Sequence, residues 1–262
     1  MKHTDIKVLL NTKAENQEVT VCGWVRTSRN SKSVAFVEVN DGTSLKNIQV
    51  VVDKSADSDY KEPRVGTSVK ITGTLVEGRN NTVEINVLPS GVEILGICPA
   101  DYPLQKKGCS MEYLRSMPHL RGRTNTFNAI WRVRSVLAQA IHKYFQKNNY
   151  VYVNTPLITG SDCEGAGEMF NVTTIGYSNE YKNEEDYYAN DFFGRRAGLS
   201  VSGQLEGEVA AMAMGKIYTF GPSFRAENSN TPKHLAEFWH IEPEVAFAEL
   251  PDVIEIAEDM LK

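Results

Sequence analysis

Short segments with alternating apolar and polar residues fill the first third of the chain. They read EVTVCGWV, SVAFVEV, NIQVVV, TSVKITGTLV, TVEINV and GVEIL between residues 18 and 95. Turn-forming residues separate them, including Asn40-Asp41-Gly42 and Pro89-Ser90-Gly91. Five or six closely spaced strands predict a small all-β barrel, and the five-stranded oligonucleotide-binding (OB) fold is the natural candidate.

The spacing of apolar residues becomes helical after a proline-containing connection. Positions 127, 130, 131, 137, 138, 141, 144 and 145 are apolar and follow the possible N-caps Thr124 and Thr126. This pattern predicts a long amphipathic helix that ends near Asn148-Asn149. The next segment, YVYVNTPLI, reads as a strand interrupted at Pro156, because proline cannot donate to a sheet ladder.

The second half mixes strands and helices. Residues 171–198 are polar and aromatic, and we expect a long loop or insertion there. LSVSGQLEGEVAAMAMGKIYTFGPSF then predicts strand, helix and strand, and LPDVIEIAEDMLK opens a final helix with Pro251 in its first turn. We therefore expect a barrel domain at 1–98, a linker at 99–123 and an α+β domain at 124–262. Because that helix stops inside an apolar pattern, we also expect a truncated chain.

Composition adds few constraints. The 262 residues are 41% hydrophobic and 23% charged, as in ordinary soluble globular proteins with room for two domains. The sequence contains no apolar run of membrane-spanning length, so we expect a cytoplasmic protein without membrane association. The four cysteines show neither disulfide nor metal-ligand spacing and are expected to be isolated thiols.

The distribution of charge is more informative than its sum. A net charge of -5 argues against a protein that coats nucleic acid through bulk electrostatics. Residues 115–134 nevertheless contain arginines and no acid: Arg115, Arg121, Arg123, Arg132 and Arg134. Such a strip suits one bound polyanion, and a solvated charged face is the alternative.

The segment FRAENSNTPKHLAEFWHIEPEVAF, residues 224–247, carries the clearest chemistry. It resembles motif 2 of the class II aminoacyl-tRNA synthetases, in the asparaginyl and aspartyl branch. Such enzymes join an amino-acid carboxylate to the α-phosphorus of ATP, which requires stabilisation of phosphate charge and no covalent enzyme nucleophile. A planar guanidinium can hold both groups, so Arg225 is the first catalytic candidate.

The resemblance implies roles for four neighbours of that arginine. Glu227, the second catalytic candidate, would lie beside the adenylate and the amino-acid side chain. His234 would contact the distal phosphates of ATP, and Phe238 would stack on adenine. Glu242 would face the asparagine pocket from the next strand. Taken singly, each of these residues also has an ordinary structural explanation, such as a core aromatic or a salt-bridge partner.

Further segments match the same family in the same order. Residues 124–157 resemble motif 1, which implies a homodimer with Pro156 at its interface. SDCEGAGEMF resembles the amino-acid-binding loop, in which Glu164 would pair with the substrate α-ammonium. LSVSGQLEGE resembles the strand and turn from which Ser202 and Gln204 face the amino acid. The implied catalytic domain is an antiparallel sheet with helices.

The segment CGWVRTSRNSKSVAFVEVNDG resembles the anticodon-binding barrel of the aspartyl, asparaginyl and lysyl enzymes. The resemblance implies that Phe36 stacks on the central anticodon uracil and that Gln49 faces the first base. Arg29 would meet a phosphate or base edge, and Glu84 would lie near the third base. From the alternation alone, Phe36 would be a core residue and Gln49 would face solvent.

Local residues favour asparagine over aspartate as the substrate. Aspartyl enzymes place a lysine shortly after the glutamine of SGQ, whereas Leu205-Glu206-Gly207 follow it here. Without that cation, Glu227 would accept hydrogen bonds from a substrate amide and repel a second carboxylate. The resemblance therefore implies a bacterial-type asparagine–tRNA ligase that uses ATP, L-asparagine and tRNA(Asn).

One part of the family pattern is missing. Motif 3, a glycine-rich segment with an ATP-binding arginine, does not occur in the chain, and the Mg²⁺ ligands are expected beyond Lys262. This polypeptide alone is therefore expected to be inactive. Two alternatives stay open: a non-catalytic tRNA-binding module, and an aspartyl-tRNA synthetase of relaxed specificity that also charges tRNA(Asn).

Overall fold

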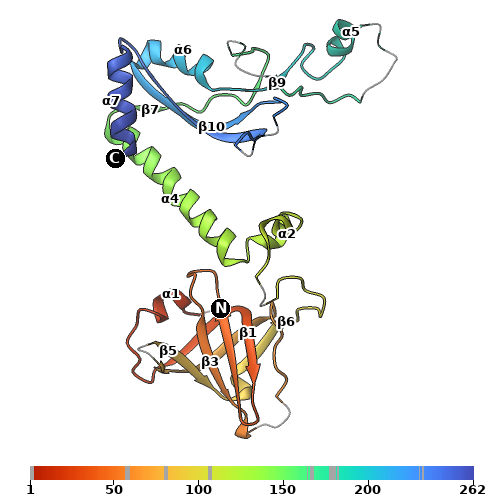
Figure 1. Ribbon diagram of the computed structural model, residues 1–262, viewed down its shortest axis with the longest axis vertical. Coiled ribbons are helices and arrows are strands. Elements are labelled where there is room, and N and C mark those ends of the chain that lie inside the picture. The colour runs from red at the N-terminus through yellow and green to blue at the C-terminus, as the bar shows by residue number, and fades with distance from the viewer. Residues whose placement is uncertain are drawn as a thin grey trace. The chain divides into compact units, whose positions relative to one another are not determined.

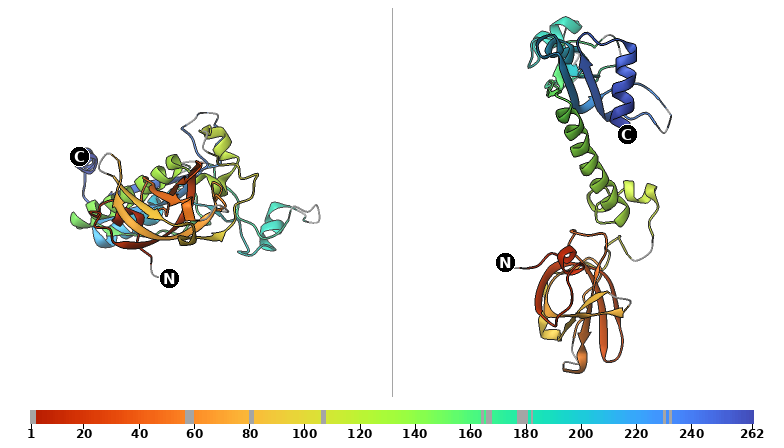
Figure 2. Two further views of the ribbon diagram at one scale, coloured as in Figure 1. Left: turned by 90° about the horizontal axis from the view of Figure 1, so that it is seen from below. Right: turned by 90° about the vertical axis from the view of Figure 1, so that its left-hand side faces the viewer.

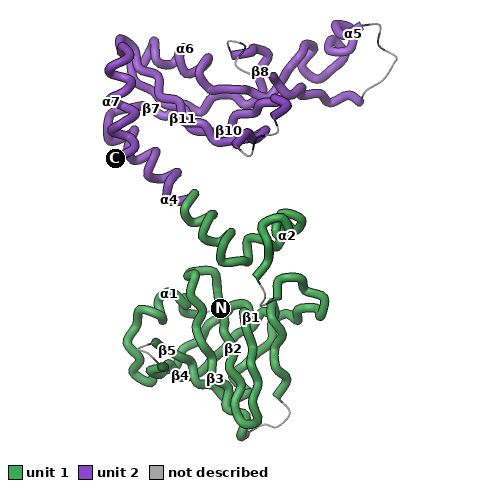
Figure 3. The backbone as a smooth tube through the Cα atoms, viewed as in Figure 1, with its two compact units in different colours: residues 1–134 green, residues 135–262 purple. Residues whose placement is uncertain are grey.

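The chain folds into two compact units, residues 1–134 and 135–262 (Figure 3). The division falls within one continuous helix, α4 (Asn125–Lys147), so the connection at 99–123 belongs to the first unit. The computed structural model describes residues 3–56, 60–79, 82–105, 108–163, 165, 168–176, 181, 183–229, 231 and 233–262.

The first unit contains a closed barrel (Figures 1 and 2). The strand order is β1-β2-β3-β5-β4-β6, and an additional pairing of β1 with β4 closes the first five into a barrel. β3 and β5 run parallel, and the other pairs are antiparallel. The strands are β1 (Glu18–Asn30), β2 (Val34–Asn40), β3 (Ile48–Asp53), β4 (Ser68–Glu77), β5 (Val83–Val87) and β6 (Val92–Gly96). The predicted OB fold is confirmed, with β6 added to β4.

Alternate residues of the strands fill the barrel, as the sequence pattern predicted. Fully buried apolar side chains come from every strand of the closed barrel, including Val21, Val37, Val50, Ile71 and Ile85. A short N-terminal helix, α1 (Ile6–Leu9), adds two more buried side chains and was not predicted. Its four residues are too few to show helical periodicity in the sequence.

The first unit also contains the short helices α2 (Met111–Arg115) and α3 (Pro118–Arg121). The structure describes 3-10 turns at η1 (Lys54–Ala56) and η3 (Pro89–Gly91). Both helices lie in the proline-containing connection, which is irregular as expected. Of the two possible caps of α4, Thr124 is the one used: its hydroxyl accepts from the Phe127 amide at 3.3 Å. Thr126 lies inside the helix.

The second unit is built on a three-stranded sheet of order β11-β10-β7. The strands are β7 (Val151–Tyr152), β10 (Lys216–Phe224) and β11 (Glu237–Val245). Phe145 of α4 packs with Tyr218 and Phe220 of β10 in a buried cluster that also receives Met260 of α7 (Leu250–Leu261). Helix α6 (Gln204–Met214) contacts β10 and β11, and both helices were predicted.

The segment around Pro156 behaves as predicted, whereas the expected long loop needs correction. Pro156 lies between β7 and β8 (Ile158–Thr159), and β8 pairs with β9 (Gly198–Leu199). Within residues 171–198, a short helix α5 (Glu184–Ala189) replaces part of the predicted loop. Asn183 caps it by accepting from the Asp186 amide at 2.8 Å.

No disulfide joins Cys22, Cys98, Cys109 and Cys163, all of which lie among the described residues. Of the helices that the structure describes, none has both the length and the apolar composition to cross a bilayer.

Candidate functional site

One face of the β10–β11 hairpin is polar and the other is apolar. Side chains of one strand alternate between the faces, so Phe238, His240 and Glu242 of β11 share a side. Thr219 and Ser223 of β10 lie opposite Glu242 and Phe238 in the antiparallel register, which places them on that same side. The apolar face packs on α4. Helix α6 packs on the polar face near Ile217 and Glu244, so the end of that face with Phe238 remains for a ligand.

Arg225 follows β10 at the edge of this polar face. Its guanidinium carbon lies 5.5 Å from the centre of the Phe238 ring, and its Nη1 lies 3.9 Å from Glu227 Oε1. Nε is enclosed and has no hydrogen-bond partner among the described residues. The structure thus brings together the predicted Arg225, Glu227 and Phe238, and the guanidinium retains capacity to bind an anion.

His234 lies in the loop that joins the two strands. It is exposed, and its Nδ1 is hydrogen-bonded to the Thr231 hydroxyl. The backbone of the same loop is held near its base, where the Arg225 amide donates to Ala236 at 3.0 Å.

Glu242 is the most strongly held carboxylate of the face. It accepts hydrogen bonds from the Ser202 hydroxyl, the Gly203 amide at 3.1 Å and the Thr219 hydroxyl at 2.8 Å, and His240 Nδ1 lies 3.0 Å from it. Burial opposes its charge, but the hydrogen bonds of His240, Ser202 and Thr219 outweigh burial and lower the Glu242 pKa to about 2.

These four donors account for the capacity of one carboxylate, which has about four lone-pair sites. The group therefore ties the turn at Ser202 and Gly203 to strands β10 and β11. A direct contact between Glu242 and a substrate would require one of the present donors to be replaced.

Gly203 allows this close approach. A Cβ atom at that position would lie 2.9 Å from Thr155 Oγ1, 3.0 Å from Thr219 Oγ1 and 3.1 Å from Glu242 Oε2. The predicted Gln204 begins α6, and its side-chain amide donates to Glu208 Oε1 at 3.0 Å. Ser202 and Gln204 thus lie on one turn, with Ser202 directed toward Glu242.

The predicted amino-acid loop is seen only in part. Glu164, expected to bind the ammonium group, lies outside the described residues. Gly165 adopts a φ of 63°, and the carbonyl of Glu168 accepts from the Ala226 amide at 2.7 Å. This hydrogen bond holds the end of the loop beside the residue that follows Arg225.

Sequence reasoning missed Gly203, Thr219 and His240. His240 could have been found, because it lies two residues from both Phe238 and Glu242 on the same strand. Thr219 depends on the register between β10 and β11, and Gly203 depends on a contact with Glu242, so neither carries a local sequence signal.

All four predicted anticodon residues line one cavity of the barrel, of about 690 Å³. Arg29 and Phe36 are direct partners in the β1–β2 register, as are Gln49 and Glu84 between β3 and β5. The Gln49 amide donates to Glu84 Oε1 at 2.8 Å. Further lining residues not predicted from the sequence are Leu10, Glu38, Lys46, Asn47, Arg79, Thr82 and Val83.

The arginines of the predicted basic strip make different local contacts. Arg121 covers the Phe127 ring at 4.8 Å, and Arg132 donates to Asn128 at 2.8 Å. Arg123 instead lines a cavity of the first unit. Arg115, Arg123, Arg132 and Arg134 are all exposed, and the strip as a surface for a bound polyanion stays a prediction.

Helix α4 exposes large apolar side chains: Ile130, Trp131, Val133, Val136 and Leu137. Such an exposed apolar surface is typical of a protein–protein interface. No group of His, Cys, Asp and Glu that could hold a metal ion occurs in the part of the chain that the structure describes.

Two protein-family models match the chain. One, described as "tRNA synthetases class II (D, K and N)", matches residues 110–262. The other, described as "OB-fold nucleic acid binding domain", matches residues 19–95. The first match covers more than half of the chain and contains the polar face of β10 and β11.

Curated relatives match over the whole chain. The asparagine–tRNA ligase of Parabacteroides distasonis is 51% identical over 267 residues, which cover 100% of this chain and 57% of the relative. That of Acetivibrio thermocellus is 52% identical over 269 residues, with 100% and 58% covered. The chain thus spans little more than half the length of these relatives.

Solved structures share the fold. Asparaginyl-tRNA synthetase from Pyrococcus horikoshii, complexed with asparaginyl-adenylate, has a TM-score of 0.82 and 25% identity, covering 100% of this chain and 57% of that one. The Entamoeba histolytica enzyme in complex with asparaginyl-adenylate has a TM-score of 0.74 and 25% identity, covering 96% and 55%. An OB barrel followed by a class II catalytic fold is therefore shown.

Proposed function

Because this chain belongs to the class II tRNA synthetases of the D, K and N group, we propose that the full protein activates L-asparagine with ATP and transfers it to tRNA(Asn). Identities of about one half with proteins named asparagine–tRNA ligase support this substrate. The observation that carries the proposal is the grouping of Arg225, Glu227 and Phe238 at one edge of the polar face.

Each of these residues suits one part of the activation step. The asparagine carboxylate attacks the α-phosphorus of ATP, pyrophosphate leaves, and negative charge grows on the phosphate oxygens. Arg225 would bind both the α-phosphate and the attacking carboxylate, since its fork is permanently charged. Phe238 would stack on the adenine, and His234 would contact the distal phosphates.

Selection of asparagine would involve Glu227, beside Arg225, together with residues farther along the face. Glu227 would accept a hydrogen bond from the substrate amide, and Glu164 would pair with its ammonium group. Ser202 and Gln204 would border the amino acid, in a turn that Glu242 holds in place. In this proposal Glu242 acts chiefly by positioning that turn.

The barrel cavity would read the anticodon. Phe36 offers a ring for stacking, while Gln49, Glu84 and Arg29 supply donors and acceptors around it. Because Gln49 already bonds to Glu84, a base that reaches this pair would meet preoriented groups.

We also propose a cytoplasmic homodimer. Pro156 and the exposed apolar residues of α4 would lie at its interface. An exposed group of large apolar side chains is typical of such a contact. The reaction would use ATP with Mg²⁺.

ATP–pyrophosphate exchange on the full-length protein tests the proposal. We expect asparagine to support exchange and aspartate to support far less. Arg225→Gln should lower the rate by roughly three orders of magnitude. Arg64→Gln, an exposed arginine of the barrel, is the charge-matched control and should leave exchange unchanged. A preference for aspartate would refute the substrate assignment.

Measuring tRNA binding and pyrophosphate exchange in both the 262-residue chain and the full-length protein distinguishes an enzyme from a binding module. We expect it to bind tRNA(Asn) through the barrel and to show no exchange by itself. If the full-length protein also lacks exchange while binding the tRNA, the non-catalytic alternative is favoured.

A further inference from the structure

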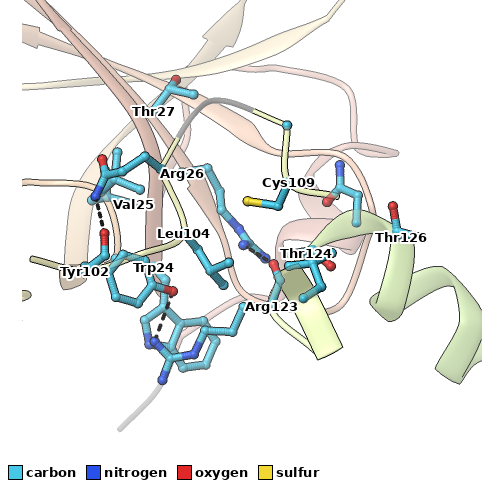
Figure 4. Close-up of a pocket in the computed structure, with 16 residues that line it drawn as sticks. Trp24, Val25, Arg26, Thr27, Tyr102, Leu104, Cys109, Arg123, Thr124 and Thr126 are labelled. Atoms are coloured by element: carbon cyan, nitrogen blue, oxygen red, sulfur yellow. Dashed lines mark hydrogen bonds between the residues drawn. The ribbon is translucent and has the colours of Figure 1, made fainter. Parts of the chain in front are cut away.

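A second cavity of the first unit, of about 400 Å³, lies between β1 and the segment that leads into α4 (Figure 4). Its lining includes Trp24, Arg26, Tyr102 and Arg123. None of its lining residues belongs to the barrel cavity of Phe36 or to the site face of the second unit.

A β-bulge directs Arg26 into this cavity. The β1–β2 register shifts between Val25 and Thr27, so Arg26 is the extra residue of β1. Val25 stays paired on its other edge: its amide donates to Thr67 at 2.9 Å, and its carbonyl accepts from Gly66 at 2.8 Å. Because bulges turn a side chain out of the regular alternation, the position of Arg26 is built into the strand.

Tyr102 and Gly66 hold a second arginine in the same cavity. Gly66 has a φ of +89°, and a Cβ there would lie 2.6 Å from Cys98 Sγ and 3.0 Å from Tyr102 Cε1. Only glycine lets the Tyr102 ring come this close. The Arg123 guanidinium then lies 5.8 Å from the ring centre, and its Nη1 lies 3.4 Å from the Tyr102 hydroxyl (Figure 4).

The two guanidiniums lack a negative partner among the described residues. The described residues that line the cavity include no aspartate or glutamate. Arg26 Nη1 donates to the Arg123 carbonyl, while Arg26 Nε is enclosed without a hydrogen bond. Burial, reinforced by the charge of Arg123 and opposed by Tyr102, lowers the pKa of Arg26. A half-buried guanidinium beside a second, exposed one, with no counter-charge on the described lining, favours an anionic ligand.

We propose that this cavity binds a nucleotide, with its phosphoryl group on Arg26 and Arg123 and its base against Trp24. Guanidinium forks match phosphate oxygens in geometry. A volume of about 400 Å³ exceeds what a bare phosphate needs and lies in the range of small-molecule sites. Trp24 is 46% exposed and offers a ring for stacking.

Calorimetric titration of the 262-residue chain with AMP tests the proposal. An Arg225→Gln background removes the main anion ligand of the candidate ATP site. We expect AMP to bind at least about tenfold more tightly than adenosine or inorganic phosphate. Arg26→Gln and Arg123→Gln should each weaken AMP binding roughly 10- to 100-fold. Arg134→Gln removes the same charge outside the cavity and should have no effect.

A parallel titration with a tRNA(Asn) transcript identifies the source of the nucleotide. A nucleotide of RNA is the occupant if two results are found together. AMP binds with a Kd above about 1 mM, and tRNA affinity falls at least about tenfold in Arg26→Gln and Arg123→Gln but not in Arg134→Gln. Arg26 is half-buried, so its substitution could disturb folding. Arg123→Lys changes an exposed residue and keeps the charge but not the guanidinium fork, so it should weaken nucleotide binding less than Arg123→Gln does.

The proposal is overturned if neither ligand depends on the two arginines in variants whose circular dichroism matches the parent chain. It is also overturned if inorganic phosphate binds as tightly as AMP, since the base would then contribute nothing.

Discussion

Replacing Glu242 by glutamine should destabilise the second unit measurably. The carboxylate accepts from Ser202, Gly203 and Thr219 and lies 3.0 Å from His240. The Glu242 pKa falls from its ordinary 4.5 to about 2, which corresponds to about 3 kcal/mol at 1.36 kcal/mol per pKa unit. The side chain is only 11% exposed, so solvent screening reduces this value little. We expect Glu242→Gln to lower the free energy of unfolding by about that amount at neutral pH.

The loss of unfolding free energy in Glu242→Gln should also depend on pH in a defined direction. A carboxylate whose pKa is lower in the folded state stabilises the protein above its unfolded pKa, and this contribution disappears as pH falls through the folded pKa. The difference in unfolding free energy between the parent chain and Glu242→Gln should therefore be complete above about pH 5 and shrink toward pH 2.

Urea unfolding followed by tryptophan fluorescence measures this difference. Trp239 lies on β11, and Trp24→Phe with Trp131→Phe leaves it as the sole reporter, since the sequence has 3 tryptophans. Glu237→Gln, at the exposed start of the same strand, is the control and should change stability by less than about 0.5 kcal/mol. If Glu242→Gln falls in that same range at neutral pH, the hydrogen-bonded carboxylate does not hold the turn and our reasoning is wrong.

Three further substitutions test other parts of the molecule. Phe36→Ala should weaken tRNA(Asn) binding roughly 10- to 100-fold through lost stacking, and an unchanged filter-binding affinity would contradict the anticodon assignment. Gly66→Ala should destabilise the barrel by about 1–3 kcal/mol in thermal unfolding, because φ is +89° and its Cβ would lie 2.6 Å from Cys98 Sγ; Gly122→Ala, with open space around it, is the control. Trp131→Glu should convert a dimer of the full protein to monomer in sedimentation, and a persistent dimer would place the interface elsewhere.

The sequence predicted the barrel well because each strand encodes its own inward face. In β2, Ala35, Val37 and Val39 are buried, as strict alternation requires. The same rule assigns Phe36 to the outer face of β2. It does not show that Phe36, Arg29 and Gln49 share one cavity, because that depends on how three strands are registered. Family resemblance supplied this grouping, and the strand pairing agrees with it.

The sequence predicted less of what surrounds the candidate site. Helix α5 was expected to be loop because its residues are polar and aromatic without an apolar stripe; its start is fixed locally by Asn183. The tyrosine at position 187 is half-buried and bonds to the Ile175 carbonyl at 3.2 Å, a contact between segments that no local pattern encodes. The same limit applies to Gly203 and Thr219, because both donate to Glu242, which lies far along the chain.

The position of Glu242 indicates that the residues with free binding capacity are different from the residue that holds the turn at Ser202. Arg225 and Phe238 lie at the loop end of the hairpin and retain capacity for a ligand, whereas Glu242 lies deeper and has its acceptors filled. The filled carboxylate joins the turn at Ser202, which comes from a different segment, to the strands that carry Arg225. A change at Glu242 should therefore move the proposed amino-acid side of the site relative to the proposed ATP side. In the full protein this predicts a larger rise in KM for asparagine than for ATP, whereas direct binding of ATP by Glu242 would give the reverse.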